Sequence, residues 1–195
     1  MELGVREKNR GERRDALVAA AYELFRERGF VGTTMEDVAD RAGLSRRTAF
    51  RYFASKDELV FPQRAERLSL FERELEARPG ETALATVKRA CLEMARDYAA
   101  SRKRMLAQWR IVEAEPALLG REIQLDRDFE KAIESAFEKG GASRRRARVR
   151  AAAIVGAVRA TLREWLEEGA TADLVRLGRE TFAELEQGFD QEKRR

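Results

Sequence analysis

Residues 42–53 read Ala-Gly-Leu-Ser-Arg-Arg-Thr-Ala-Phe-Arg-Tyr-Phe, and this stretch decides the fold that we predict. Gly43 can adopt the left-handed backbone conformation that a tight turn between two helices needs. Ser45 is a favourable N-cap for the helix that follows. Within that helix, Ala49 and Phe53 are four residues apart and therefore share one face. The pattern predicts two short helices joined by a glycine-containing turn, the second helix being apolar on one side and basic on the others.

The rest of the chain also has the apolar periodicity of helices, with only 3 prolines to interrupt them. Thr33 with Glu36, and Ser55 with Glu58, have the spacing of capping boxes. The helices are expected at residues 12–28, 35–42, 46–53, 56–78, 81–100, 102–112, 116–140, 143–168 and 171–187. We therefore predict an all-α fold of about nine helices, with a three-helix head over residues 1–56 and a helical body over residues 57–195.

Composition excludes several classes of protein. The 195 residues include 39 Lys and Arg, 35 Asp and Glu and no histidine, and Cys91 is the single cysteine. The chain therefore cannot form an internal disulfide, it lacks the commonest general base and zinc ligand, and we expect no cofactor, metal or catalytic site. No apolar stretch is long enough to cross a membrane and the N-terminal residues do not read as a signal peptide, so we expect a cytoplasmic protein without a membrane partner.

The third predicted helix concentrates positive charge. Every charged residue between positions 41 and 56 is basic. Arginines on such a helix can reach guanine O6 and N7 in the major groove, while hydroxyls and cations beside it can hold phosphates. The DNA-facing residues are expected to be Arg46, Arg47, Thr48 and Arg51, with Thr33, Thr34, Tyr52 and Lys56 near phosphates. The alternative is that these arginines only solvate an exposed helix face, and their place on the third helix of a glycine-turned head favours DNA.

Several segments of the head carry a family resemblance. They are Leu24-Phe25, Gly29-Phe30, Thr33-Thr34, Val38-Ala39, Ala42-Gly43-Leu44-Ser45, Thr48 to Phe53 and Ser55 to Leu59. Together they resemble the DNA-binding signature of the TetR family over residues from about 13 to 60. The resemblance implies an all-α, TetR-like homodimer that binds a palindromic double-stranded operator, usually as a ligand-released repressor. It also implies base contacts from Arg46, Arg47 and Thr48, and phosphate contacts from Thr33, Thr34, Tyr52 and Lys56.

One position departs from the family pattern. Phe50 stands where the family more often has a tyrosine whose hydroxyl touches a phosphate. Either Phe50 makes an apolar contact with DNA in its place, or the affinity depends more on the arginines.

The resemblance further implies a ligand pocket in the helices after the head. The candidates are Cys91, Met94, Tyr98, Met105, Trp109, Arg110, Val112, Leu125 and Phe129. Met, Trp and Tyr suit an adaptable apolar cavity with a few polar groups, and Arg110 is a candidate anchor for an anionic group. The alternative for each residue is an ordinary helical core. The segment Arg46 to Phe53 and the Arg110 to Leu118 stretch are also similar to an actinobacterial subgroup near the mycofactocin-associated regulators, which suggests long-chain acyl-CoA as one possible effector.

Two C-terminal helices are the candidates for the dimer interface. Their expected interface residues are Ala151, Ile154, Val155, Val158, Leu162, Trp165, Leu174, Leu177, Phe182 and Leu185. Two copies of these helices would form a four-helix bundle, whereas the alternative is that the stripe packs inside one chain. The basic run from Arg144 to Arg150 has no assigned role.

Three functions remain open. The first is a ligand-responsive repressor. The second is a DNA-binding protein of the same fold without a small-molecule effector, either architectural or regulated by a partner. The third is an enzyme, which the absence of histidine makes remote.

Overall fold

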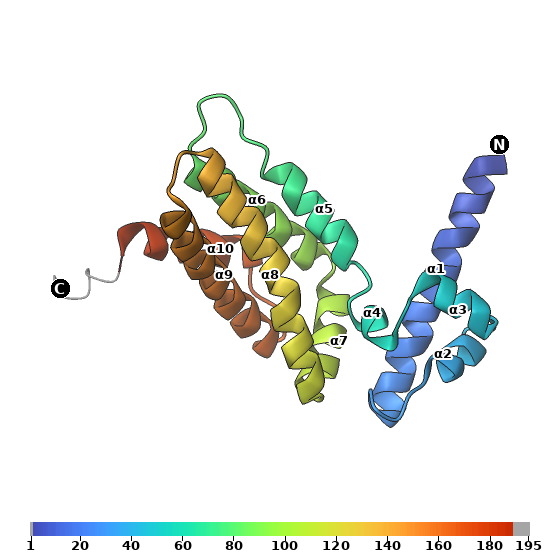
Figure 1. Ribbon diagram of the computed structural model, residues 1–195. Coiled ribbons are helices and arrows are strands. Elements are labelled where there is room, and N and C mark those ends of the chain that lie inside the picture. Colours follow the sequence, from blue (N-terminus) through green and yellow to red (C-terminus); the bar gives the residue numbers. More distant parts are fainter. Residues whose placement is uncertain (1, 189–195) are drawn as a thin grey trace. The chain divides into compact units, whose positions relative to one another are not determined.

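The computed structural model describes residues 2–188, except for the side chains of residues 2–8 and Leu125. The described residues form ten α-helices and no strand, so the all-α prediction is confirmed (Figure 1). The helices are α1 (Glu2–Arg28), α2 (Met35–Arg41), α3 (Arg46–Tyr52), α4 (Lys56–Val60), α5 (Arg64–Glu74), α6 (Ala83–Ala100), α7 (Arg102–Glu113), α8 (Pro116–Lys139), α9 (Arg144–Glu167) and α10 (Leu174–Gln187). None of them is long and apolar enough to cross a membrane.

The chain divides into two compact units. Unit 1 contains the residues up to 64 together with residues 107–120, and unit 2 contains residues 65–106 and those from 121 onward. The C-terminal half of α7 and the first turn of α8 therefore belong to the same unit as the head. The predicted division into a DNA-binding head over residues 1–56 and a body over residues 57–195 concerns function, and it stays a prediction.

The core of unit 1 forms around α1. The helix α1 packs against α2 and α4, and α2 packs against α3. Leu17, Val38 and Leu59 are fully buried there, and Val112 and Leu118 complete the same apolar cluster. Burying a side chain of this size contributes about 1.5–3 kcal/mol. Because one side of α3 packs against this core, the opposite side of α3 is the one that faces solvent.

The turn between α2 and α3 has the predicted chemistry. Gly43 has φ of +66°, and the Leu44 N–H donates to the Ala39 carbonyl over 2.9 Å. Ser45 Oγ accepts a hydrogen bond from the Thr48 N–H over 3.2 Å and so caps α3. A side chain at position 43 would be strained in this conformation, so the glycine allows the reversal.

The prediction of one helix over residues 56–78 is wrong. The structure has two helices there, α4 and α5, which are separated at Pro62. The helix α4 ends at Val60, Phe61 leaves the helical region with φ of −113° and ψ of 55°, and α5 starts only at Arg64. Proline lacks an amide N–H and disfavours helical geometry in the residue before it. The same helix also ends earlier than predicted, at Glu74.

Three further details of the helix ends differ from the predictions. The first capping box is formed by Thr34 and Asp37, one residue later than expected, because Thr34 rather than Thr33 directly precedes the first residue of α2. Ser55 makes no capping bond, and Glu58 accepts instead from the Ala54 N–H over 2.8 Å. The helix α1 starts at Glu2 rather than near residue 12, because Gly11 alone costs a helix only about 1 kcal/mol relative to alanine.

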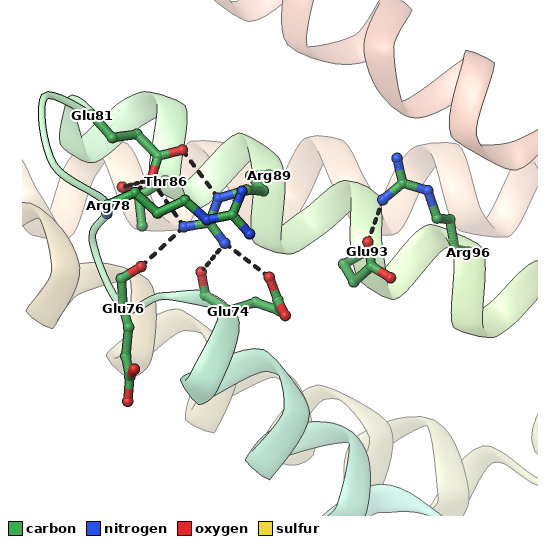
Figure 2. A network of polar contacts seen from close by, with 8 residues as sticks. All are labelled: Glu74, Glu76, Arg78, Glu81, Thr86, Arg89, Glu93 and Arg96. Carbon is green, nitrogen blue, oxygen red and sulfur yellow. Dashed lines mark hydrogen bonds and ion pairs between the residues drawn. The ribbon is translucent and has the colours of Figure 1, made fainter.

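Unit 2 is a helical bundle in which α10 packs against α6 and α9. An arginine clamp fixes its connection between α5 and α6 (Figure 2). Arg89 donates to the carboxylates of Glu74 and Glu81 over 2.8 Å and 2.9 Å and to the backbone carbonyl of Glu76 over 3.0 Å. The hydrogen bonds from Arg89 lower the pKa of Glu81 to about 2, and the Thr86 hydroxyl adds a further bond over 3.0 Å.

Candidate nucleic-acid interface

The helix α3 has one buried side and one exposed side. Ala49 is fully buried, and Phe53 at its C-cap is 3% exposed, so these two residues hold the helix against the core of unit 1. Arg46, Arg47 and Arg51 are exposed. The predicted basic face is therefore presented to solvent on a helix whose position is fixed from behind.

Arg46 and Phe50 lie together on this exposed face. The guanidinium carbon of Arg46 is 5.6 Å from the centre of the Phe50 ring, and Phe50 is 43% exposed. Glu36 on α2 is 3.6 Å from Arg46 Nη1, an ion pair that is exposed at both ends and therefore weak. Arg46 can leave this pair for a stronger acceptor, and the exposed Phe50 ring supplies an apolar surface beside it.

The other polar side chains of α3 differ in how many contacts they make within the chain. No ion pair or hydrogen bond of the Arg47 side chain occurs among the described residues, so its guanidinium is available. The Thr48 hydroxyl is 2.9 Å from Ser45 Oγ, and Thr48 is half-buried. Arg51 lies 5.4 Å from the centre of the Tyr52 ring. Arg47 is thus the donor on α3 with the fewest competing contacts.

Three predicted phosphate-contacting residues bond within the chain. Thr33 is 1% exposed, and its hydroxyl donates to the Gly29 carbonyl over 2.9 Å. The Thr34 hydroxyl and the Thr34 backbone N–H donate to the Asp37 carboxylate over 2.6 Å and 2.8 Å. Both hydrogen bonds lower the pKa of that carboxyl. The Lys56 ammonium donates to the carbonyls of Phe30 and Thr33 over 2.7 Å and 3.0 Å. In this structure these side chains stabilise the turn before α2. Thr33 is buried, Lys56 is half-buried and Thr34 is exposed.

The predicted ligand-pocket residues fall into both units. Cys91, Met94, Tyr98, Met105 and Phe129 belong to unit 2, whereas Trp109, Arg110 and Val112 belong to unit 1. The side chain of Leu125 lies outside the described residues. Several of the others pack as ordinary core residues, since Met94 and Val112 are buried in separate apolar clusters and Phe129 lies edge-on to Phe71 with ring centres 5.3 Å apart. Arg110 is exposed, and Trp109 Nε1 is buried without a hydrogen-bond partner.

Sequence reasoning missed Arg67, which lies in the interior of unit 2. Its side chain is 10% exposed, and its Nε donates to Asp97 over 2.8 Å. Its Nη1 contacts only the Met105 sulfur at 3.3 Å, and its Nη2 is buried without a partner. A buried donor without an acceptor is costly, so Arg67 Nη2 can bind a further acceptor. A lone arginine in a helix gives no signal in sequence, because most such residues are exposed.

The predicted pocket residues Tyr98 and Cys91 are both uncharged, and Tyr98 adjoins this arginine. Tyr98 lies under the Arg67 guanidinium, 4.6 Å from the ring centre, and burial raises the pKa of Tyr98 to about 12. Burial also raises the pKa of the Cys91 thiol to about 12. Both side chains are therefore protonated at neutral pH, and the thiol is a poor nucleophile.

A hollow of ≈ 760 Å³ opens elsewhere in unit 2. Its lining includes the apolar residues Leu68, Leu75 and Ala132 and the charged residues Glu72 and Lys131. None of the predicted pocket residues with a described side chain lines it. Among the described residues, no cluster of His, Cys, Asp and Glu side chains could hold a metal ion.

The predicted dimer stripe is partly used inside the chain. Ala151, Ile154, Trp165, Leu174 and Phe182 are each at most 4% exposed. Val155, Val158, Leu162, Leu177 and Leu185 are half-buried. The buried half of the stripe packs in the interior of its own chain, which was the alternative left open by the sequence. The half-buried residues keep some surface for a partner.

The sequence matches known regulators of transcription. Residues 17–61 match the family model of the bacterial regulatory proteins of the tetR family. The HTH-type transcriptional regulator TcmR of Streptomyces glaucescens is 33% identical over 134 residues, which are 65% of this chain and 59% of TcmR. The putative mycofactocin biosynthesis transcriptional regulator MftR of Mycobacterium tuberculosis is 49% identical over 39 residues, 20% of each chain. The matches thus span about a fifth to three fifths of these curated relatives.

The fold is also that of solved members of this family. The TetR-family transcriptional repressor FadR of Thermus thermophilus, solved in complex with lauroyl-CoA, is similar with a TM-score of 0.59 at 19% identity. The similarity covers 90% of this chain and 94% of that one. The exposed arginine face of the helix-turn-helix and the family match therefore fall on the same residues. Residues 17–61 form a DNA-binding segment of the tetR family, and the chain has the fold of a solved TetR-family repressor.

Proposed function

We propose that the chain is a homodimeric repressor, released from a palindromic operator by a small apolar or amphipathic ligand. Residues 1–56 would bind DNA, and residues 57–195 would bind the ligand and the second copy. The observation that carries the DNA-binding half is the exposed arginine face of α3, held from behind by Ala49 and Phe53. A two-fold dimer would read half-sites separated by at least one helical turn, ~34 Å. Because its target is the chromosome, we also propose a cytoplasmic location.

Arg47→Ala tests the DNA-binding half of this proposal. We expect the variant to lose about 1–3 kcal/mol of affinity for the operator, because a bidentate contact between arginine and guanine has that magnitude. The operator is obtained by selecting duplexes from a random pool with the wild-type protein. Fluorescence anisotropy then measures the affinity of both proteins for the selected duplex and for a scrambled one.

The matched control is Arg145→Ala, an equally exposed arginine on α9 in unit 2. It should leave both affinities unchanged. If Arg47→Ala binds the selected duplex as tightly as wild type does, then Arg47 makes no base contact.

The dimer interface that we propose uses the outward faces of α9 and α10. The half-buried members of the predicted stripe remain candidates. The neighbouring Val149 is an apolar residue that is 61% exposed, and Ala152, Ala153, Gly156 and Ala160 are also exposed on α9. Small residues allow two helices to approach closely, and dimers of this kind form four-helix bundles.

The part of the proposal that concerns the small-molecule effector rests on side chains in the interior of unit 2. The unpartnered Arg67 Nη2, with Tyr98 and Met105 beside it, offers a polar anchor among apolar side chains, and the FadR neighbour was solved with lauroyl-CoA. We expect saturating lauroyl-CoA to lower the operator affinity about 5–150-fold, the usual range of allosteric coupling. In Arg67→Met the response should be several-fold smaller. Anisotropy with the selected duplex measures both, with free CoA as the control and thermal unfolding as the check on folding.

An intact complex at high excess of lauroyl-CoA would exclude this ligand class. Native mass spectrometry of the purified protein would then show whether another small molecule is retained. The absence of any retained molecule would favour the second candidate, a DNA-binding protein of this fold without an effector. That candidate gains support from Met94, Val112 and Phe129, which fill core positions rather than line a cavity.

A further inference from the structure

A second basic site lies beside the recognition helix. In unit 1, a hollow of ≈ 460 Å³ is lined by Asn9, Arg10, Arg13, Arg51 and Tyr52. Among the residues whose side chains the structure describes, the lining includes three guanidinium groups and no carboxylate. None of the three residues from α1 belongs to the segment that matches the family model.

The hollow is built from two rigid elements. Arg10 and Arg13 are three residues apart and therefore share one face of α1, which continues past them toward the N-terminus (Figure 1). Arg51 comes from the last turn of α3 and lies against the Tyr52 ring. Helices hold these side chains more firmly than a loop would.

The charges around the hollow call for an anion. Cations that face one another repel, and none of the described side chains that line the hollow is an acid that could offset this repulsion. Guanidinium groups bind phosphate through paired hydrogen bonds, and the Asn9 amide and the Tyr52 hydroxyl can add further donors. A phosphate group suits this set of donors in both charge and shape.

We propose that this hollow binds a backbone phosphate of the DNA strand that flanks the bases read by α3. The inference rests on the proposed function, because Arg51 joins the hollow to the recognition helix. This continuity favours DNA over an acidic protein segment. The N-terminal part of α1 then positions the head on the duplex without reading sequence, as phosphate contacts do.

The test compares Arg10→Ala/Arg13→Ala with wild type on a random-sequence 30-bp duplex. Each phosphate contact contributes about 0.9 to the slope of log affinity against log salt, so the double variant should lose up to about 0.9 from this slope. The ratio of wild-type affinity to variant affinity should then narrow about three- to fourfold between 50 and 200 mM KCl. Fluorescence anisotropy with the full chain measures the slopes, and circular dichroism checks that the variant is folded.

Arg145→Ala/Arg146→Ala is the matched control, since both residues are exposed arginines on α9 in unit 2. Its slope should equal that of wild type. The proposal is overturned if the α1 double variant keeps the wild-type slope while Arg47→Ala loses specific affinity, a result that would leave the proposed function intact. Salt-independent binding by the wild type would reject both proposals. If the double variant loses binding to polyglutamate but not to the duplex, the hollow serves an acidic protein segment instead.

Discussion

Replacing Trp165 with alanine should lower the free energy of unfolding of unit 2 by about 3–5 kcal/mol. Trp165 on α9 is 1% exposed, and its indole N–H donates to the Ala172 carbonyl over 2.9 Å. Its removal leaves a large cavity and an unsatisfied carbonyl beside the turn that leads to α10. The loss is a large part of the stability of a typical domain, which is about 5–15 kcal/mol.

Urea unfolding followed by circular dichroism measures this loss. Trp165→Phe is the control, because it keeps an aromatic ring in the site and removes only the indole hydrogen bond. Its loss should be clearly smaller than that of alanine. If Trp165→Ala unfolds at the same urea concentration as wild type, the residue is not a core residue, and its predicted place in the dimer interface becomes the better assignment.

Local signals in the sequence were sufficient to predict the head. Gly43 and Ser45 each act within a few residues, through a left-handed backbone and a cap on α3. The alternation of Ala49 and Phe53 with arginines then shows which side of α3 is exposed. The missed break at Pro62 was also a local signal, since proline disfavours a helical residue before it. Giving Pro62 more weight than the apolar periodicity around it would have predicted α4 and α5 as separate helices.

Other features depend on contacts between residues that are distant in the chain. A helical stripe shows which residues are buried but not what covers them, so Trp165 and Phe182 were assigned to a dimer interface although they pack within the chain. The same limit applies to Lys56, whose ammonium bonds to the carbonyls of Phe30 and Thr33. It also applies to Arg67, whose missing acceptor is visible only when its neighbours are known.

These contacts change the expected distribution of binding energy on the DNA side. Thr33 and Lys56 are engaged in the turn before α2, so phosphate binding must rely more on other groups. Arg47 and Arg51 remain exposed on α3, and Arg10 and Arg13 add positive charge from α1. We expect this distribution to compensate for Phe50, which lacks the hydroxyl found more often in the family.

Val38→Asp should unfold the head and abolish DNA binding while unit 2 stays folded. Val38 on α2 is fully buried in the apolar cluster of unit 1, whose buried members have no charged or hydrogen-bonding side-chain group. An uncompensated buried charge costs about 3–5 kcal/mol, enough to unfold a small unit. The core of unit 2 consists of a separate set of residues, so its stability should not depend on position 38.

The two tryptophans of the chain allow each unit to be followed separately. Trp109 belongs to unit 1 and Trp165 to unit 2, so Trp109→Phe and Trp165→Phe backgrounds each report on a single unit. With Val38→Asp, the emission of Trp109 should shift to the red, whereas the emission of Trp165 should stay that of a buried indole. Val31→Asp, at a position that is 75% exposed in the same head, should change neither. If both tryptophans respond to Val38→Asp together, the two units fold as one cooperative body, and ligand binding in unit 2 would be coupled directly to the folding of the head.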